Sequence, residues 1–453
     1  MGGLVSRRKR SGSSNSSSTS SSSPPPEQTT PFRLLDLPPE IWLEICRHLT
    51  TPIPTDSFPA GPSDSVLAFS QTCTLFNGLL RPSIWNSITY FPLRRDSVRS
   101  KDYRKKRSLS ALKQILDEAE SSTLGPLPIE LLQVSHPEGA RGEDEEEVEA
   151  EQYAFVEIVQ RLTGEDGGLK VLWLKSVFLS STGPAKELGD RLILAIAGSK
   201  SLKAVRFNQV EAGSAKLYSG LGRMEGMKTL QVLHGQRSLL EFARICPNLE
   251  SLLMWPERRR FGSLVPIICS LLGSLRYLSL DAVSEPDCFV QLTAELQRRQ
   301  SLALPTPLTE LFLEGHQASG DRSALISALS HTDLKRLALY HLHAFKPNLI
   351  HDIAVAVPNL EGLTLVLGDT STAFSWPSPL EAYIDQLTKL KHLKFYASDR
   401  QSPNPQRLDQ MQVEYDSLSK VGKAVDSLET AVAILLDVSQ GAFLLSFSLF
   451  VIL

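Results

Sequence analysis

Apolar residues return in one fixed pattern through the second half of the chain. From Leu169 onward the pattern L-x-x-L-x-L, with conservative replacements, occurs nine times at spacings of 22 to 33 residues. Its last apolar positions alternate with other residues, which predicts a short strand with one buried face. Apolar residues three and four apart follow several copies, as at Leu188, Leu192 and Ile196, and predict helices. The copies begin at Leu169, Leu202, Met227, Leu249, Leu275, Leu308, Leu334, Leu360 and Leu390, with a degenerate copy at Ile129.

A single strand-plus-helix unit cannot cover its own apolar face, so neighbouring units must stack into a curved array. Most of the spacings fall in the range of leucine-rich repeats. The pattern therefore predicts an α/β leucine-rich-repeat solenoid over residues 129–407. The asparagine that usually follows the strand of such repeats is missing from most copies, which leaves the turn geometry open.

Strand alternation also predicts which side chains face away from the core. Positions three, five and seven of each copy should line the concave face. Aromatic side chains and arginine are common anchors of protein-binding surfaces, although the same side chains could serve packing alone. The candidates for binding a protein substrate are Trp173, Trp255, Tyr277, Phe312, Tyr340 and Tyr396, with Arg206, Arg336, Glu310 and Lys394 between them.

A separate apolar pattern lies near the N-terminus, in the stretch LLDLPPEIWLEICRHL at 34–49. Pro38 and Pro39 suit the first positions of a helix, and Ile41, Ile45 and Leu49 then recur every four residues. After a proline-rich insert at 50–63, a second helix is predicted, closed by Pro82. Two or three short helices make a small core that needs a partner or a neighbouring domain to cover it.

The segments LPPEIWLEICRHL and LAFSQTCTLFNGLL resemble the F-box, the helical module that docks on the Skp adaptor of SCF (Skp–cullin–F-box) ubiquitin ligases. The resemblance covers about residues 32–85 and implies a helical domain at 31–92, with a Skp-family adaptor and a cullin scaffold as partners. CPNLESL and VPNLEGL likewise resemble the irregular repeats found behind F-boxes. The long insert after Leu49 departs from the pattern, and an ordinary helical hairpin is the alternative. The residues implied to bind the adaptor are Leu35, Leu37, Pro38, Ile41, Ile45, Leu49, Leu67, Ser70, Cys73 and Phe76.

The first thirty residues predict a disordered, Ser- and Pro-rich tail. Gly2 fits the M-G-x-x-x-[ST] myristoylation motif, and the basic cluster at 7–10 would supply the second signal for peripheral membrane contact. The alternative is a nuclear import signal. A basic linker and helix are expected at 93–128, and an acidic loop exposed to solvent at 143–151.

The C-terminal segment 408–453 is expected to cap the solenoid. Apolar spacing predicts one amphipathic helix from Leu408 to Leu436. The apolar run at 441–453 is too short to span a bilayer. Burial against the cap, a non-native terminus and a tail anchor are the three interpretations of that run.

Composition narrows the function classes. A net charge of −3 gives no basis for binding nucleic acid, and five scattered cysteines without C-x-x-C predict free thiols of a cytoplasmic or nuclear protein. The sequence contains no nucleotide-binding loop, zinc-protease motif or nucleophile elbow. His341, His343 and His351 lack the further ligands of a metal site. We therefore expect no catalytic residue, metal or cofactor.

Together these patterns predict a non-catalytic substrate-recognition adaptor of an SCF-type ligase, whose repeats hold an unidentified protein substrate near the ubiquitin-transfer machinery. The alternative is a membrane-tethered leucine-rich-repeat scaffold, anchored through Gly2, that recruits a partner without ubiquitin transfer.

Overall fold

The structure is a computed structural model of the 453-residue chain. It describes residues 41, 85–90, 108–121, 127–135, 145–177, 179, 184–213, 215–218, 220–234, 239, 241–255, 265–281, 286–314, 319–342, 349–367, 386–399 and 430–437. The predicted tail at 1–30 and the apolar run at 441–453 lie outside these residues.

The strands form one twelve-stranded sheet in which every strand pairs in parallel with the next along the chain. Strand order therefore equals sequence order, as stacking of successive repeats requires. The strands are β1 (Ser87–Tyr90), β2 (Leu131–Ser135), β3 (Val171–Lys175), β4 (Ala204–Asn208), β5 (Thr229–Leu233), β6 (Ser251–Trp255), β7 (Tyr277–Asp281), β8 (Glu310–Glu314), β9 (Arg336–Leu342), β10 (Gly362–Leu367), β11 (His392–Asp399) and β12 (Thr430–Asp437).

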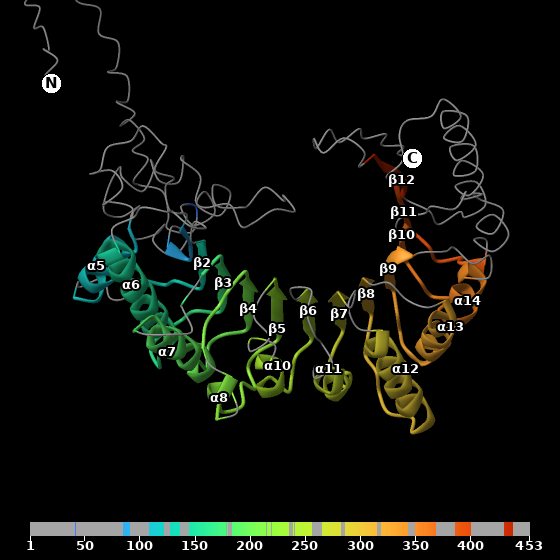
Figure 1. The fold of residues 1–453 in the computed structure, drawn as a ribbon, viewed down its shortest axis with the longest axis horizontal. Coiled ribbons are helices and arrows are strands. Elements are labelled where there is room, and N and C mark those ends of the chain that lie inside the picture. The colour runs from blue at the N-terminus through green and yellow to red at the C-terminus, as the bar shows by residue number, and fades with distance from the viewer. Residues whose placement is uncertain are drawn as a thin grey trace, which may run out of the picture.

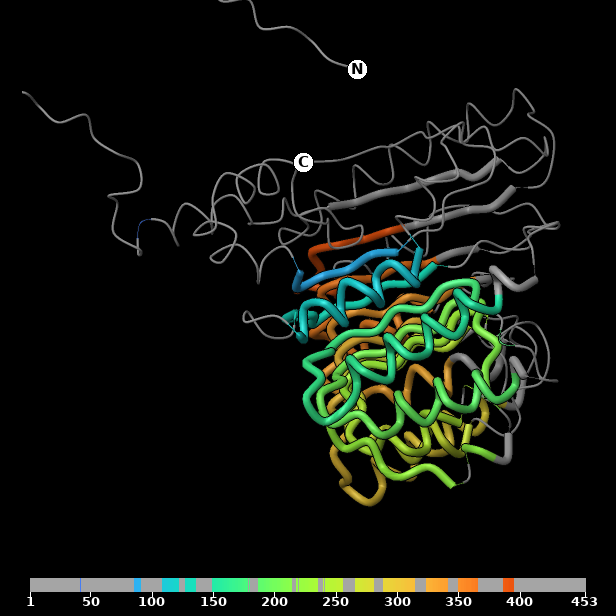
Figure 2. Tube along the Cα trace, turned by 90° about the vertical axis from the view of Figure 1, so that its left-hand side faces the viewer, coloured from blue at the N-terminus to red at the C-terminus, as the bar shows by residue number. Residues whose placement is uncertain are grey.

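The described strands line the inside of an arc and the helices cover its outside (Figure 1). Seen from the side, successive units are stacked coils of one chain (Figure 2). The helices are α5 (Leu109–Glu120), α6 (Glu145–Thr163), α7 (Pro184–Gly198), α8 (Ala215–Tyr218), α10 (Phe242–Ile245), α11 (Val265–Leu271), α12 (Pro286–Ser301), α13 (Ser319–Ala328), the 3-10 turn η2 (Leu329–His331) and α14 (Leu349–Ala356).

The core lies between the two layers and is built from alternate strand residues. In β3, Leu172 and Leu174 are at most 1% exposed, whereas Trp173 and Lys175 face away from the core. The same alternation repeats along the sheet, and the inward residues join one continuous hydrophobic cluster with the helices. The predicted α/β solenoid of stacked strand-plus-helix units is therefore confirmed.

Most copies lack the asparagine that usually follows the strand of a leucine-rich repeat. After three of the strands, backbone hydrogen bonds between neighbouring repeats hold the turn instead. In three consecutive repeats the residue after the strand is left-handed, with φ of 53° at Ser176, 53° at Gln209 and 48° at His234. Each backbone N–H donates to the carbonyl oxygen of the last strand residue of the next repeat, at 2.6 to 2.8 Å. The Ser176 hydroxyl also donates to Gln209 Oε1 at 3.0 Å. These hydrogen bonds offset the cost of a left-handed non-glycine residue.

The sheet begins earlier than the sequence analysis predicted. Residues 87–90, expected in the helical domain at 31–92, form β1 and pair with 131–134 of β2. Ile88 and Tyr90 pack against the core cluster, and α5, expected in the linker at 93–128, packs against α6. Without β1 the edge of β2 would leave its backbone groups unpaired, and the alternating SITY sequence suits a strand.

The acidic run expected as a loop is helical from Glu145 onward, because α6 spans Glu145–Thr163. Glutamate and alanine favour helices, and acidic residues near a helix N-terminus interact well with its dipole. The buried residues Phe155, Val159 and Leu162 continue the helix along the core. The solvated-loop prediction for 143–151 is therefore wrong over 145–151.

The prediction of a helix is also wrong for the last residues of the expected capping helix. Residues 430–437 form β12, which pairs in parallel with β11 from Thr430 against His392 to Asp437 against Asp399. The unpaired edge of β11 offers a full row of backbone partners, and the apolar sequence TAVAILLD can serve a strand as well as a helix. Residues 408–429 lie outside the described part of the chain. Within that part, no helix is long and apolar enough to cross a membrane.

Candidate binding surface on the concave face

Parallel register brings the outward side chains of successive repeats into continuous rows across the concave face. The central row runs through the third residue of each short strand, and its members come from β2 to β11. This row consists of Gln133, Trp173, Arg206, Gln231, Leu253, Ser279, Phe312, Ala338, Thr364 and Lys394. In β3, β4 and β6 the burial of the side chains alternates as predicted for positions three, five and seven.

Trp173 and Arg206 contact each other at the N-terminal part of this row. The guanidinium carbon of Arg206 lies 5.6 Å from the centroid of the Trp173 ring, within the range of a cation–π interaction. Arg206 is partly buried, and this burial lowers its pKa. Among the described residues Arg206 has no carboxylate partner. The pair therefore presents a positively charged, incompletely hydrated group on the concave face.

Three aromatic residues gather further along the face, on β6 to β8. Tyr277 and Phe312 lie 5.2 Å apart between ring centroids, tilted by 35°. Trp255 Nε1 donates to Ser279 Oγ at 3.2 Å, which fixes the indole beside them. All three rings are partly exposed, and burial raises the pKa of the Tyr277 hydroxyl. We call Trp255, Tyr277 and Phe312, together with Leu253, the aromatic cluster.

The other predicted surface residues differ in what they offer. Arg336 pairs with Glu310 across β8 and β9 at 3.6 Å, so these two charges satisfy each other. Tyr340 is partly buried and lies at the point where the register between the paired strands β9 and β10 shifts. Lys394 is exposed on β11. The backbone of Tyr396 lies opposite Val366, and its side chain is outside the described part of the structure.

Charge is distributed unevenly over the concave face. The outward positions of β3 to β6 hold two cations, Lys175 and Arg206, and no Asp or Glu. The outward positions of β7 and β8 that the structure describes instead include an acidic residue, Glu310. The N-terminal half of the face therefore attracts negative charge, and the aromatic cluster lies at the border between the two regions.

A second row of charges, at the residue before each strand, was missed by the sequence analysis. Lys228 pairs with Glu250 at 2.7 Å, and Glu361 accepts Lys335 at 3.4 Å and Lys391 at 3.7 Å. Hydrogen bonding from these lysines lowers the pKa of Glu250 and of Glu361. The signal was readable, because position two of nearly every copy is charged. Such exposed pairs contribute little stability but favour the correct register between neighbouring repeats.

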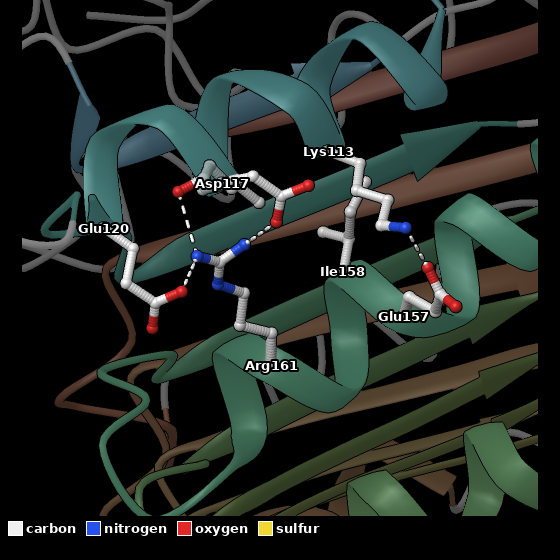
Figure 3. A pocket seen from close by; sticks show the side chains of 7 residues that line it. Lys113, Asp117, Glu120, Glu157, Ile158 and Arg161 are labelled. Carbon is white, nitrogen blue, oxygen red and sulfur yellow. Dashed lines mark hydrogen bonds and ion pairs between the residues drawn. The ribbon is translucent and has the colours of Figure 1, made fainter. Parts of the chain in front are cut away.

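The pocket between α5 and α6 has a volume of about 310 Å³ and carries charged side chains that pair with one another (Figure 3). Arg161 from α6 bonds Asp117 at 2.6 Å, the Leu116 carbonyl at 2.9 Å and the Glu120 carboxylate. Lys113 pairs with Glu157 at 2.6 Å. This arrangement joins the two helices and leaves no free group for chemistry.

The thiols of Cys246 and Cys269 are poorly reactive, and the described residues hold no metal-binding group. Burial raises the pKa of the Cys246 thiol to about 12 and that of Cys269 to about 11, so neither forms a thiolate readily. No three His, Cys, Asp or Glu side chains in the described ranges form a group that could hold a metal ion. His341 and His351 belong to β9 and α14, and His343 lies outside these ranges.

Of the residues implied to bind the adaptor, only Ile41 belongs to the described part of the chain. Ile41 is helical and 46% exposed. The other nine, like Gly2, lie outside that part, so their roles stay predictions. No protein-family model matches the sequence, and no curated protein is significantly similar to it.

Proposed function

We propose that this protein is the substrate-recognition adaptor of an SCF-type ubiquitin ligase. The observation that carries the proposal is the combination, in one chain, of an F-box-like segment with a solenoid whose concave face presents aromatic and arginine side chains. The segment would dock on a Skp-family adaptor, which a cullin scaffold carries. The concave face would hold the substrate.

The mechanism needs no catalytic group in this chain. Holding a substrate beside an active site in another subunit raises its effective concentration there and orients its lysines. Surface contacts are sufficient for this role, and the buried thiols and internally paired charges of the described residues are compatible with it.

The experiment is capture of the tagged full-length protein from cells, followed by identification of Skp and cullin subunits. The test variant is Leu37→Ala with Ile41→Ala, two residues implied to contact the adaptor. The control is Phe312→Ala, which alters the concave face and leaves the F-box-like segment intact. We expect Skp and cullin with the wild type and the control and not with the double variant. Equal recovery from all three, or from none, would contradict the proposal.

The second candidate, a membrane-tethered scaffold, rests on Gly2 and the basic cluster behind it. It predicts that Gly2→Ala moves the protein out of the membrane fraction and that the wild type brings down no Skp.

A further inference from the structure

In the cationic part of the concave face, the environment of the Arg206 guanidinium favours binding of an anion. Arg206 is partly buried, stacks on Trp173 and has no carboxylate partner among the described residues. Removing part of a cation's hydration without a counter-charge is unfavourable. A bound anion would therefore relieve a cost already present in the free protein.

The ligand chemistry follows from the charges around Arg206. Lys175, on the neighbouring strand, is the other cation, and no acidic residue occupies the outward positions of β3 to β6. The planar guanidinium, fixed on the Trp173 ring, suits two parallel hydrogen bonds to one carboxylate. Phosphate sites usually gather several arginines, and this region has one, so a singly charged carboxylate fits better.

The aromatic cluster supplies the second contact. Leu253, Trp255, Tyr277 and Phe312 are partly exposed and adjoin this region along the sheet. Ser279 on β7, which accepts the hydrogen bond of the Trp255 indole, occupies the same row as Arg206 on β4, three strand spacings or about 14 Å away at about 4.8 Å per strand. An extended peptide crossing the strands covers that distance in about four residues, at about 3.3 Å per residue.

We infer that the concave face from β3 to β8 binds an extended segment of a partner protein, with an Asp or Glu carboxylate on Arg206 and an aromatic or large aliphatic side chain about four residues away on the aromatic cluster. This inference rests on the proposed function, because it describes the peptide signal by which a substrate would be selected.

The test is selection of a random peptide display library on the immobilised full-length protein. We expect enrichment of peptides with an acidic residue about four positions from Phe, Tyr, Trp or Leu. The best peptide, made synthetically, should lose at least about tenfold in affinity for Arg206→Ala, and less for Arg206→Lys, which keeps the charge without the planar fork. Arg336→Ala is the matched control, since that arginine is already paired with Glu310 on the same face.

Three results would overturn the inference: no enrichment, enrichment without acidic residues, or equal loss with Arg206→Ala and Arg336→Ala. A peptide bound tenfold tighter after phosphoserine replaces its acidic residue would also overturn it, in favour of a phosphate ligand. Matching unfolding temperatures of the variants exclude misfolding. Binding of purified Skp to the same preparation separates this test from that of the proposed function. Skp binding without acidic enrichment contradicts the inference alone, and acidic enrichment without Skp binding contradicts the ligase role alone.

Discussion

Glu151 of α6 reaches back forty-two residues in sequence to the start of α5, where its Oε2 atom accepts a hydrogen bond from the backbone N–H of Leu109 at 2.7 Å. The same carboxylate accepts the Ser110 backbone N–H at 3.2 Å and the Ser110 hydroxyl at 2.8 Å. The Tyr90 hydroxyl of β1 donates to it at 3.4 Å. One side chain thus joins β1, α5 and α6, the N-terminal elements of the described solenoid.

Glu151→Gln should loosen this end of the solenoid. The amide keeps the shape but removes the charge that strengthens the bonds at the α5 N-terminus, at a cost of about 1–2 kcal/mol. Hydrogen exchange should accelerate locally at 109–120, because solenoid ends can open without the centre. Glu149→Gln, exposed on the same helix, is the control and should change little. Equal exchange in the two variants would contradict this role of Glu151.

Two adjacent glycines should respond in opposite ways to alanine. A Cβ on Gly167 would lie 2.1 Å from the Leu162 carbonyl oxygen, whereas the nearest atom to a Cβ on Gly168 is the Ile129 carbonyl oxygen at 3.8 Å. Gly167→Ala must therefore shift the turn between α6 and β3, at a cost of about 1–3 kcal/mol. Gly168→Ala should be close to neutral in urea unfolding. A larger loss with Gly168→Ala would show that this turn is built differently.

The buried thiols should resist alkylation in the folded protein. With a pKa of about 12, Cys246 is thiolate in only about one molecule in ten thousand at pH 8, against about one in ten for a thiol of pKa 9. We expect iodoacetamide to modify Cys246 at least about a hundredfold faster after unfolding in urea, measured by peptide mass spectrometry. Rapid modification in the native state would contradict the packing of α10 against the sheet.

Acid should destabilise the solenoid partly through His331. Burial lowers the pKa of this histidine, and Arg299 nearby acts in the same direction. Because the unfolded chain then binds the proton more readily, stability is lost as the pH falls through the unfolded value of about 6.5. His331→Gln, which can keep the hydrogen bond to Thr306, should lose less stability between pH 7.5 and pH 5 than the wild type. Identical losses in urea titrations at the two pH values would contradict this assignment.

The sequence predicted the repeating part of the fold because the strand pattern depends on local alternation. Trp173, Tyr277 and Phe312 could be placed on the concave face for the same reason. The sequence could not predict the contacts that depend on which elements become neighbours when the repeats stack. The apolar residues of 430–437 satisfy a helical and a strand pattern equally, and only the open edge of β11 decides between them.

Ion pairs and hydrogen bonds between side chains of different repeats could not be predicted from the sequence either. Nothing in the sequence shows that Arg336 has a partner in Glu310 while Arg206 has no carboxylate partner in the described part of the chain, because that depends on which strands become neighbours. Likewise, Glu151 reads as one residue of an acidic run until α6 brings it to the start of α5.

The most direct test of the ligase role is complex formation between the purified full-length protein and a purified Skp-family adaptor, measured by size-exclusion chromatography with light scattering. We predict a one-to-one complex that also forms with Arg206→Ala and is lost in the Leu37→Ala, Ile41→Ala double variant. Failure of the wild-type protein to bind the adaptor, or unchanged binding by the double variant, would contradict the account.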